Sequence, residues 1–80
     1  MKINDAVTVR LNALLKEKNL STYALCKKIG LSYETLKSIK TGKTKGVTLK
    51  TIVLIANGLG TTASDFLNDP VFDYDNLEID

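Results

Sequence analysis

Leucine, isoleucine, valine and alanine recur at intervals of three and four residues along most of the chain, which is the spacing of one α-helix face. At the start of the chain, for example, Val7, Leu11 and Leu14 fall at i, i+4 and i+7, so a helix is predicted there. The same spacing, broken at turn residues, predicts an all-α fold. We expect helices over residues 5–18, 22–29, 33–40 and 48–59, and a fifth helix after residue 62.

Residues that begin and end helices stand at the breaks in this pattern. A hydroxyl group before a helix can accept a hydrogen bond from a free backbone N–H of the first turn. Glycine and asparagine tolerate the left-handed conformation that ends many helices. The expected caps are Ser21, Ser32, Thr48 and Thr62, and the expected helix-ending residues are Asn19, Gly30, Gly42 and Gly60. Gly58 lies inside the fourth helix and is expected to weaken it by roughly 1 kcal/mol relative to alanine.

The fourth helix is apolar over a broad face, so we expect it to be the most buried. Its predicted core residues are Leu49, Ile52, Val53, Ile55, Ala56 and Leu59. In the fifth helix, Phe66 and Leu67 are expected to return to the core, and Pro70 blocks continuation of the helix. The remaining residues alternate between apolar and acidic side chains. They either fold back as an extended arm, through Val71, Phe72, Tyr74 and Leu77, or fray.

The charge is divided unevenly along the chain. Residues 1–60 hold 11 basic residues and three acids, giving +8, whereas residues 61–80 hold six acids and no base, giving −6; the sum is the net +2. A basic body suits a polyanionic partner. We expect one domain over residues 1–69 and an acidic C-terminal arm over residues 70–80. A single cysteine allows no internal disulfide. With neither a signal peptide nor a membrane span in the pattern, we expect a cytoplasmic protein.

The segment STYALCKKIGLSYETLKSIKTG, residues 21–42, resembles the helix-turn-helix of the lambda-repressor-like family of Cro/CI-type, or XRE-type, regulators. LLKEKNLS before it, IKTGKTKG after it and VTLKTIVLIANGLGTTASDFL further on resemble the family's first helix, loop and last two helices. Together these motifs cover about residues 3–68. The resemblance implies a compact five-helix DNA-binding domain whose third helix enters the major groove.

By this resemblance, the outward side of the third helix faces base edges. The implied base-reading residues are Tyr33, Glu34, Lys37 and Ser38. Lys37 could donate to guanine, Glu34 could accept from cytosine N4, and Tyr33 could contact a thymine methyl group. Alternatives stay open for two of them. Glu34 also suits the helix dipole, and Tyr33 could pack against the second helix.

Lysines and threonines around the third helix are candidates for phosphate contacts. They are Thr22, Thr35, Lys40, Thr41, Lys43, Thr44 and Lys45. Backbone N–H groups of residues 41–46 are expected to assist, and Thr22 is expected at an exposed helix N-terminus, where anions are favoured. Such contacts position a protein on DNA without reading its sequence. The alternative is that these lysines, with Lys27 and Lys28, form an ordinary solvated surface.

The chain departs from the family pattern at three places. Thr22 stands where many members have a glutamine that braces the recognition helix. Leu15 and Lys40 replace an Arg–Glu pair together, which avoids an unpaired buried charge and frees Lys40 for phosphate. Cys26 replaces a usual alanine; it is read as a small buried residue, with a redox switch as the alternative.

The resemblance implies a sequence-specific transcriptional regulator of double-stranded DNA, with repression as the expected direction. The alternative is an interaction module of the antitoxin or phage-adaptor type that uses the acidic tail. The chain has no histidine and one cysteine, so we expect no enzyme, no metal site and no cofactor. No small-molecule ligand is evident. The fifth helix and the C-terminal arm are the candidate interface of a homodimer; the alternative is that their apolar residues only close the core.

Overall fold

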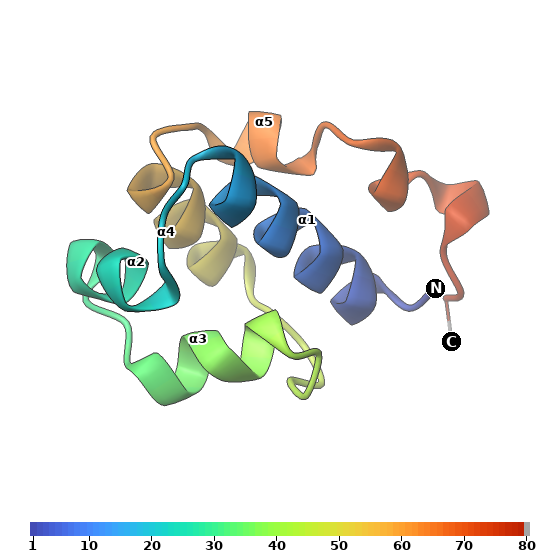
Figure 1. Cartoon of the computed structure of the whole chain (residues 1–80). Coiled ribbons are helices and arrows are strands. Elements are labelled where there is room, and N and C mark those ends of the chain that lie inside the picture. Colours follow the sequence, from blue (N-terminus) through green and yellow to red (C-terminus); the bar gives the residue numbers. More distant parts are fainter. Residues whose placement is uncertain (80) are drawn as a thin grey trace.

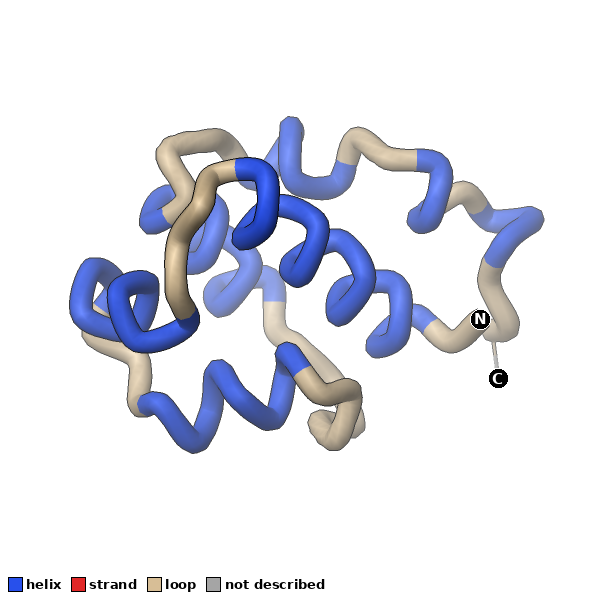
Figure 2. Tube along the Cα trace, viewed as in Figure 1, coloured by secondary structure: helices blue, strands red, loops and turns tan. Residues whose placement is uncertain are grey.

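The computed structural model describes residues 1–79 and has five α-helices followed by two short 3₁₀ turns (Figures 1 and 2). Asp80, the last residue of the predicted arm, lies outside the described residues. The predicted all-α architecture is confirmed. The elements are α1 (Ile3–Glu17), α2 (Thr22–Ile29), α3 (Tyr33–Lys40), α4 (Leu49–Gly58), α5 (Ala63–Leu67), η1 (Pro70–Phe72) and η2 (Tyr74–Asn76).

Helix α1 runs through the middle of the molecule, with α4 behind it and α2 and α3 on one side (Figure 1). It packs against α3 and η1, while α4 packs against α2 and α5. The side chains that meet between these helices form one hydrophobic core. Its largest fully buried members are Leu11, Leu25, Leu36, Ile55 and Phe66, so each of the five helices contributes one.

The predicted helix ends are confirmed where the signal is local. The side chains of Ser21, Ser32, Thr48 and Thr62 each accept a hydrogen bond from the backbone N–H three residues later. Asn19 has a φ of 53°, and Gly30 has a φ of 69°. Helix α1 begins at Ile3, two residues earlier than predicted. Its N-cap, Lys2, makes no side-chain capping bond, so the sequence carries no cap signal there.

Helix α4 is less buried than predicted. Ile52, Ile55 and Ala56 lie in the core, but the side of the helix that carries Leu49 and Val53 is open, with these residues 67% and 49% exposed. The helix packs against α2 and α5, which cover only part of its apolar circumference. Leu67, also expected in the core, is 39% exposed. The prediction of a broad buried face on α4 is therefore wrong for Leu49 and Val53, and the separate prediction that Leu67 returns to the core is wrong as well.

Gly58 lets α2 and α4 approach each other closely. A Cβ atom at this position would lie 2.4 Å from Ile29 Cγ2 and 2.6 Å from Leu25 Cδ1, both on α2. Ordinary carbon contacts are at least about a full ångström longer. Gly58 thus does more than weaken the helix as predicted, because it makes room for the first helix of the helix-turn-helix pair.

The C-terminal arm folds back along the molecule, which settles the choice between folding and fraying for its described part. The prediction that the arm is extended is wrong, because it contains the 3₁₀ turns η1 and η2. The Phe72 ring lies 6.2 Å from the Phe66 ring, centroid to centroid. Near the end of the arm, the Glu78 N–H donates to the Met1 carbonyl over 2.8 Å, and the Met1 ammonium lies 3.3 Å from Glu78 Oε1. Tyr74, expected to pack, is instead 77% exposed.

Candidate nucleic-acid interface

Helices α2 and α3 form a helix-turn-helix pair joined by Gly30. The Gly30 N–H donates to the Cys26 carbonyl over 2.9 Å as the chain turns in the left-handed conformation. Ser32 Oγ then accepts from the Thr35 N–H over 3.2 Å and starts α3. Leu36 and Ile39 are buried and fix α3 to the core, so its other side faces outward.

Three of the four predicted base-reading residues lie on this outward side. Tyr33 is 47% exposed, and Glu34 and Lys37 are exposed as well. Ser38 is half-buried, and its backbone carbonyl accepts from the Lys43 N–H over 2.9 Å. Glu34 is in the first turn of α3, where a carboxylate favours the helix whether or not it also contacts a base.

The loop after α3 turns its backbone donors inward. The N–H groups of Thr41, Gly42 and Lys43 donate to carbonyls in the last turn of α3 over 2.9, 3.2 and 2.9 Å, and the N–H of Thr44 follows the same pattern. The last carbonyls of a helix lack partners within it, which explains this preference. The expectation that N–H groups throughout residues 41–46 point at phosphate is therefore wrong for residues 41–44. The Thr41 hydroxyl is also engaged, donating to the Lys37 carbonyl over 2.8 Å.

Polar side chains of α1 hold α3 and this loop in place. Asn4 Nδ2 donates to the Thr44 carbonyl over 2.9 Å and also to the Lys45 carbonyl. Thr8 Oγ1 donates to the Ile39 carbonyl over 2.6 Å, and Asn12 Nδ2 donates to the Lys40 carbonyl over 3.0 Å. Sequence reasoning missed these three residues. Their signal is the spacing of four residues, which lines Asn4, Thr8 and Asn12 along one side of α1.

Among the residues that the structure describes, no acidic side chain forms an ion pair with the lysines around α3. Lys37, Lys40, Lys43 and Lys45 are exposed, and the ion pairs described within residues 1–79 join Met1 to Glu78 and Arg10 to Asp69. The four ammonium groups therefore present uncompensated positive charge beside the outward side of α3. Thr35 and Thr44 lie among them, exposed and half-buried respectively.

Arg10, the single arginine, lies away from this surface. Its Nε donates to the Phe66 carbonyl and its Nη2 to the Asp65 carbonyl, each over 2.8 Å. These bonds satisfy carbonyls near the end of α5. Arg10 is therefore a clamp between α1 and α5, and sequence reasoning did not single it out.

Thr22 is not exposed as predicted. It is 8% exposed, although it is the first residue of α2. Its neighbour Tyr23 is 61% exposed and lies under the Lys27 ammonium, with 5.2 Å from Nζ to the ring centroid. Any contribution of Thr22 to an anion contact must therefore come from its backbone.

Comparison with known proteins agrees with this geometry. Residues 10–70 match the model of the Cro/C1-type HTH DNA-binding domain. The chain belongs to the Cro/C1-type family. No match is found among the curated proteins. The fold class and the helix-turn-helix predicted from sequence are thereby confirmed, and DNA binding and transcription regulation follow as the family's role.

Solved structures show the same fold. An HTH_3 family transcriptional regulator from Vibrio cholerae is 32% identical, with a TM-score of 0.75 over 84% of this chain and 38% of its own. The prophage Lp1 protein 11 is 27% identical, with a TM-score of 0.79 over 91% of this chain and 97% of its own. Apo-HppE, at 23% identity and a TM-score of 0.68, shares the fold. The chain thus spans less than half of the Vibrio cholerae regulator but nearly all of the prophage protein.

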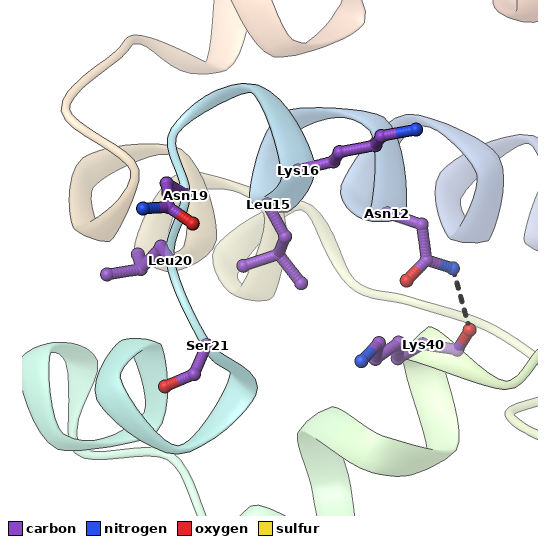
Figure 3. A pocket seen from close by; sticks show the side chains of 7 residues that line it. All are labelled: Asn12, Leu15, Lys16, Asn19, Leu20, Ser21 and Lys40. Carbon is purple, nitrogen blue, oxygen red and sulfur yellow. Dashed lines mark hydrogen bonds between the residues drawn. The ribbon is translucent and has the colours of Figure 1, made fainter.

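The two positions at which Cro/C1-type proteins often pair arginine with glutamate lie together in this chain too. Leu15 and Lys40 line one open cavity of about 460 Å³ between α1, α2 and α3 (Figure 3). Leu15 points into it, and the Lys40 side chain extends across it toward Ser21. The site of the missing ion pair is therefore an open cavity lined by the exposed Lys40.

Cys26, the third departure from the family pattern, is 7% exposed. Burial raises the pKa of its thiol above the ordinary value, which disfavours the reactive thiolate. This supports the small, buried role over the redox switch. Within residues 1–79, no group of three or more potential ligands is placed to hold a metal ion. Over the same residues, no helix has the length and apolar character that crossing a bilayer requires.

Proposed function

We propose that this Cro/C1-type protein is a repressor that binds a specific double-stranded DNA sequence with α3 in the major groove. The proposal rests mainly on one observation. The outward side of α3 is exposed beside four lysines, Lys37, Lys40, Lys43 and Lys45, that form no ion pair with the acidic residues of the described chain, 1–79. Such a surface combines charge for the phosphate backbone with side chains that can reach base edges. The proposed role requires no catalysis and no cofactor.

Base reading is assigned to the outward residues of α3. Lys37 would donate to guanine O6 or N7, and Glu34 would accept from cytosine N4. Tyr33 would contact a thymine methyl group, and the half-buried Ser38 would make a shorter-range contact at the groove edge. A good contact of this kind discriminates against a wrong base by ~1–3 kcal/mol.

Phosphate binding is assigned mainly to Lys40, Lys43 and Lys45, whose ammonium groups are exposed. Threonines take smaller parts. The Thr35 and Thr44 hydroxyls can reach outward, whereas Thr41 can only accept while it donates to α3. Thr22 would act through its backbone N–H at the start of α2. Two copies on one DNA would place their α3 helices one helical turn apart, ~34 Å, so the proposal includes a homodimer.

Selection of bound duplexes from a random DNA pool, followed by salt titration of the winner, tests the proposal. We expect an enriched palindromic motif with half-sites one turn apart. Lys43→Ala should weaken binding to all sequences and reduce the salt slope by about 0.9, whereas Lys37→Ala should change the preferred bases. Lys28→Ala, at the far end of α2, is the matched control for loss of one charge.

No enriched motif, with weak binding that is equal for all sequences, would contradict the proposal. It would favour the alternative, an interaction module that uses the acidic tail. That alternative receives less support from the fold, because the arm contacts α1 and the chain's amino end and leaves the outward side of α3 open.

A further inference from the structure

One face of the molecule exposes aliphatic side chains that the core does not use. Ile3, Leu49, Val53 and Leu67 are 53%, 67%, 49% and 39% exposed; we call these four residues the α4 face. Ile3, Leu49 and Leu67 surround a groove of about 330 Å³, whose other lining residues include Val7, Ile52 and Phe72. Hydrophobic residues this exposed and this close together are typical of an interaction surface.

The charges around the α4 face are basic, whereas the arm beside it is acidic. Lys50 follows Leu49 on α4 and is exposed; Lys45 also lines the groove, but its ammonium group is assigned to phosphate. The arm carries Asp73, Asp75 and Glu78, and its apolar residues Tyr74 and Ile79 are 77% and 58% exposed. Each surface therefore combines exposed apolar side chains with charge of the sign opposite to that of the other surface.

The groove and the arm are neighbours within one molecule. Phe72, at the start of the arm, forms one wall of the groove. A second, adjoining cavity shares Ile3, Asn4 and Lys45 with the groove and extends to Glu78 and Ile79 at the end of the arm. A two-fold axis near this trough would bring the arm of each copy to the groove of the other at the same time, as a symmetric dimer requires.

The geometry points to a homodimer in which the acidic arm of each copy lies on the α4 face of the other. This inference rests on the dimer included in the proposed function and specifies its interface. The interface predicted from sequence, the fifth helix and the arm, is thereby extended to α4. Leu49 and Val53 are the most exposed apolar residues of that helix.

The arm is needed because the α4 face alone is too small. A stable interface buries about 800 Å² per partner, roughly a sixth of the 5187 Å² surface of the chain. A fully exposed aliphatic side chain offers about 60–120 Å², so four that are about half exposed fall well short. Adding Tyr74, Ile79 and the polar contacts of the arm brings the interface toward that size.

Sedimentation velocity of the 80-residue chain over a range of concentrations, without DNA, tests the α4 face. We expect a monomer–dimer equilibrium that Val53→Lys weakens by at least about tenfold, because a buried ammonium loses its hydration. Val9→Lys is the matched control. Val9 is 48% exposed on α1, nearly opposite the groove residue Val7 on the helix. Circular dichroism melts establish that both variants fold.

A charge exchange tests whether the arm acts between copies. Lys50→Glu alone and Asp73→Lys/Asp75→Lys alone should each weaken the dimer. An equimolar mixture of the two variants should dimerise again, because in the mixed pair both arm–groove contacts join opposite charges. A contact within one chain could not be restored by mixing.

Three results would overturn the interface: a wild-type chain that stays monomeric at every concentration, equal weakening by Val9→Lys and Val53→Lys, or no recovery on mixing. A monomer would leave the α4 face to a different protein. The DNA selection decides the proposed function separately. A monomer that reads a specific sequence defeats only the interface, whereas a dimer that ignores DNA defeats only the proposed function.

Discussion

Replacing Gly58 by alanine should have two opposing effects on the free energy of unfolding. Gly58 lies where α4 packs against α2, the first helix of the helix-turn-helix pair. Helix propensity favours alanine by about 1 kcal/mol. Against this, the new Cβ would lie 2.4 Å from Ile29 Cγ2 and 2.6 Å from Leu25 Cδ1, where ordinary contacts begin at 3.4 Å. The two side chains would have to retreat by 3.4 − 2.4 = 1.0 Å and 3.4 − 2.6 = 0.8 Å.

The steric effect should win. Leu25 is fully buried, so its methyl group has no free space to enter, and overpacking of this kind costs about 1–3 kcal/mol. After the propensity gain of about 1 kcal/mol, we expect Gly58→Ala to lower the free energy of unfolding by about 1 kcal/mol. The measurement is urea unfolding followed by circular dichroism, with the shift in midpoint read at constant slope.

Two companions make the result interpretable. Asn57→Ala, at the exposed neighbouring position of α4, should gain about 0.5 kcal/mol from propensity alone. Ile29→Ala removes the nearer of the two contacts, so Gly58→Ala should cost less in that background than in the wild type. If Gly58→Ala instead stabilised the protein as Asn57→Ala does, the close approach of α2 and α4 would be refuted.

Three further predictions concern other parts of the molecule. Arg10→Lys keeps the charge but loses the two bonds to α5 carbonyls, so unfolding in urea should show a loss of about 1.5–3 kcal/mol; a loss within fitting error would contradict the clamp. Burial raises the pKa of the Cys26 thiol above 9.0, so the thiol of the unfolded chain ionises at a lower pH than that of the folded chain. The free energy of unfolding should therefore decline as the pH rises above 9. Cys26→Ala should lack that part of the decline, and identical pH profiles would contradict the shift. Asn4→Ala should speed hydrogen exchange in residues 43–47 and weaken binding to all DNA sequences alike, whereas a changed base preference would show that Asn4 acts elsewhere.

The sequence predicts best those features that depend on neighbouring residues. A serine or threonine cap bonds to a backbone group three residues away, so Ser21, Ser32, Thr48 and Thr62 could be identified without knowledge of the fold. Asn19 and Gly30 depend on their own φ values, which is equally local. The helix-turn-helix followed because these local signals occur at the spacing of a known family.

Features that depend on which helix covers which could not be predicted in the same way. The spacing of Leu49 and Val53 looks the same whether a helix is covered by its own chain or by a second copy, so both were assigned to the core. The position of Thr22 at a helix start predicts an exposed residue, but in the folded chain it is only 8% exposed. The donors of residues 41–44 were assigned to phosphate, although carbonyls of α3 take them first.

The polar side chains along one side of α1 connect the phosphate-binding loop with the proposed dimer interface. Asn4, Thr8 and Asn12 bond to carbonyls of α3 and its loop, including that of Lys45, so α1 helps to fix the position of the phosphate-binding loop. The first turn of α1, which contains Asn4, also contributes Ile3 to the groove. It follows Lys2, which forms an isolated β-bridge with Glu78 of the arm. A copy seated on the α4 face would therefore contact the turn that holds the phosphate-binding loop. Because coupling between two binding events is reciprocal, any tightening of that loop by dimer formation must be matched by an equal tightening of the dimer on DNA.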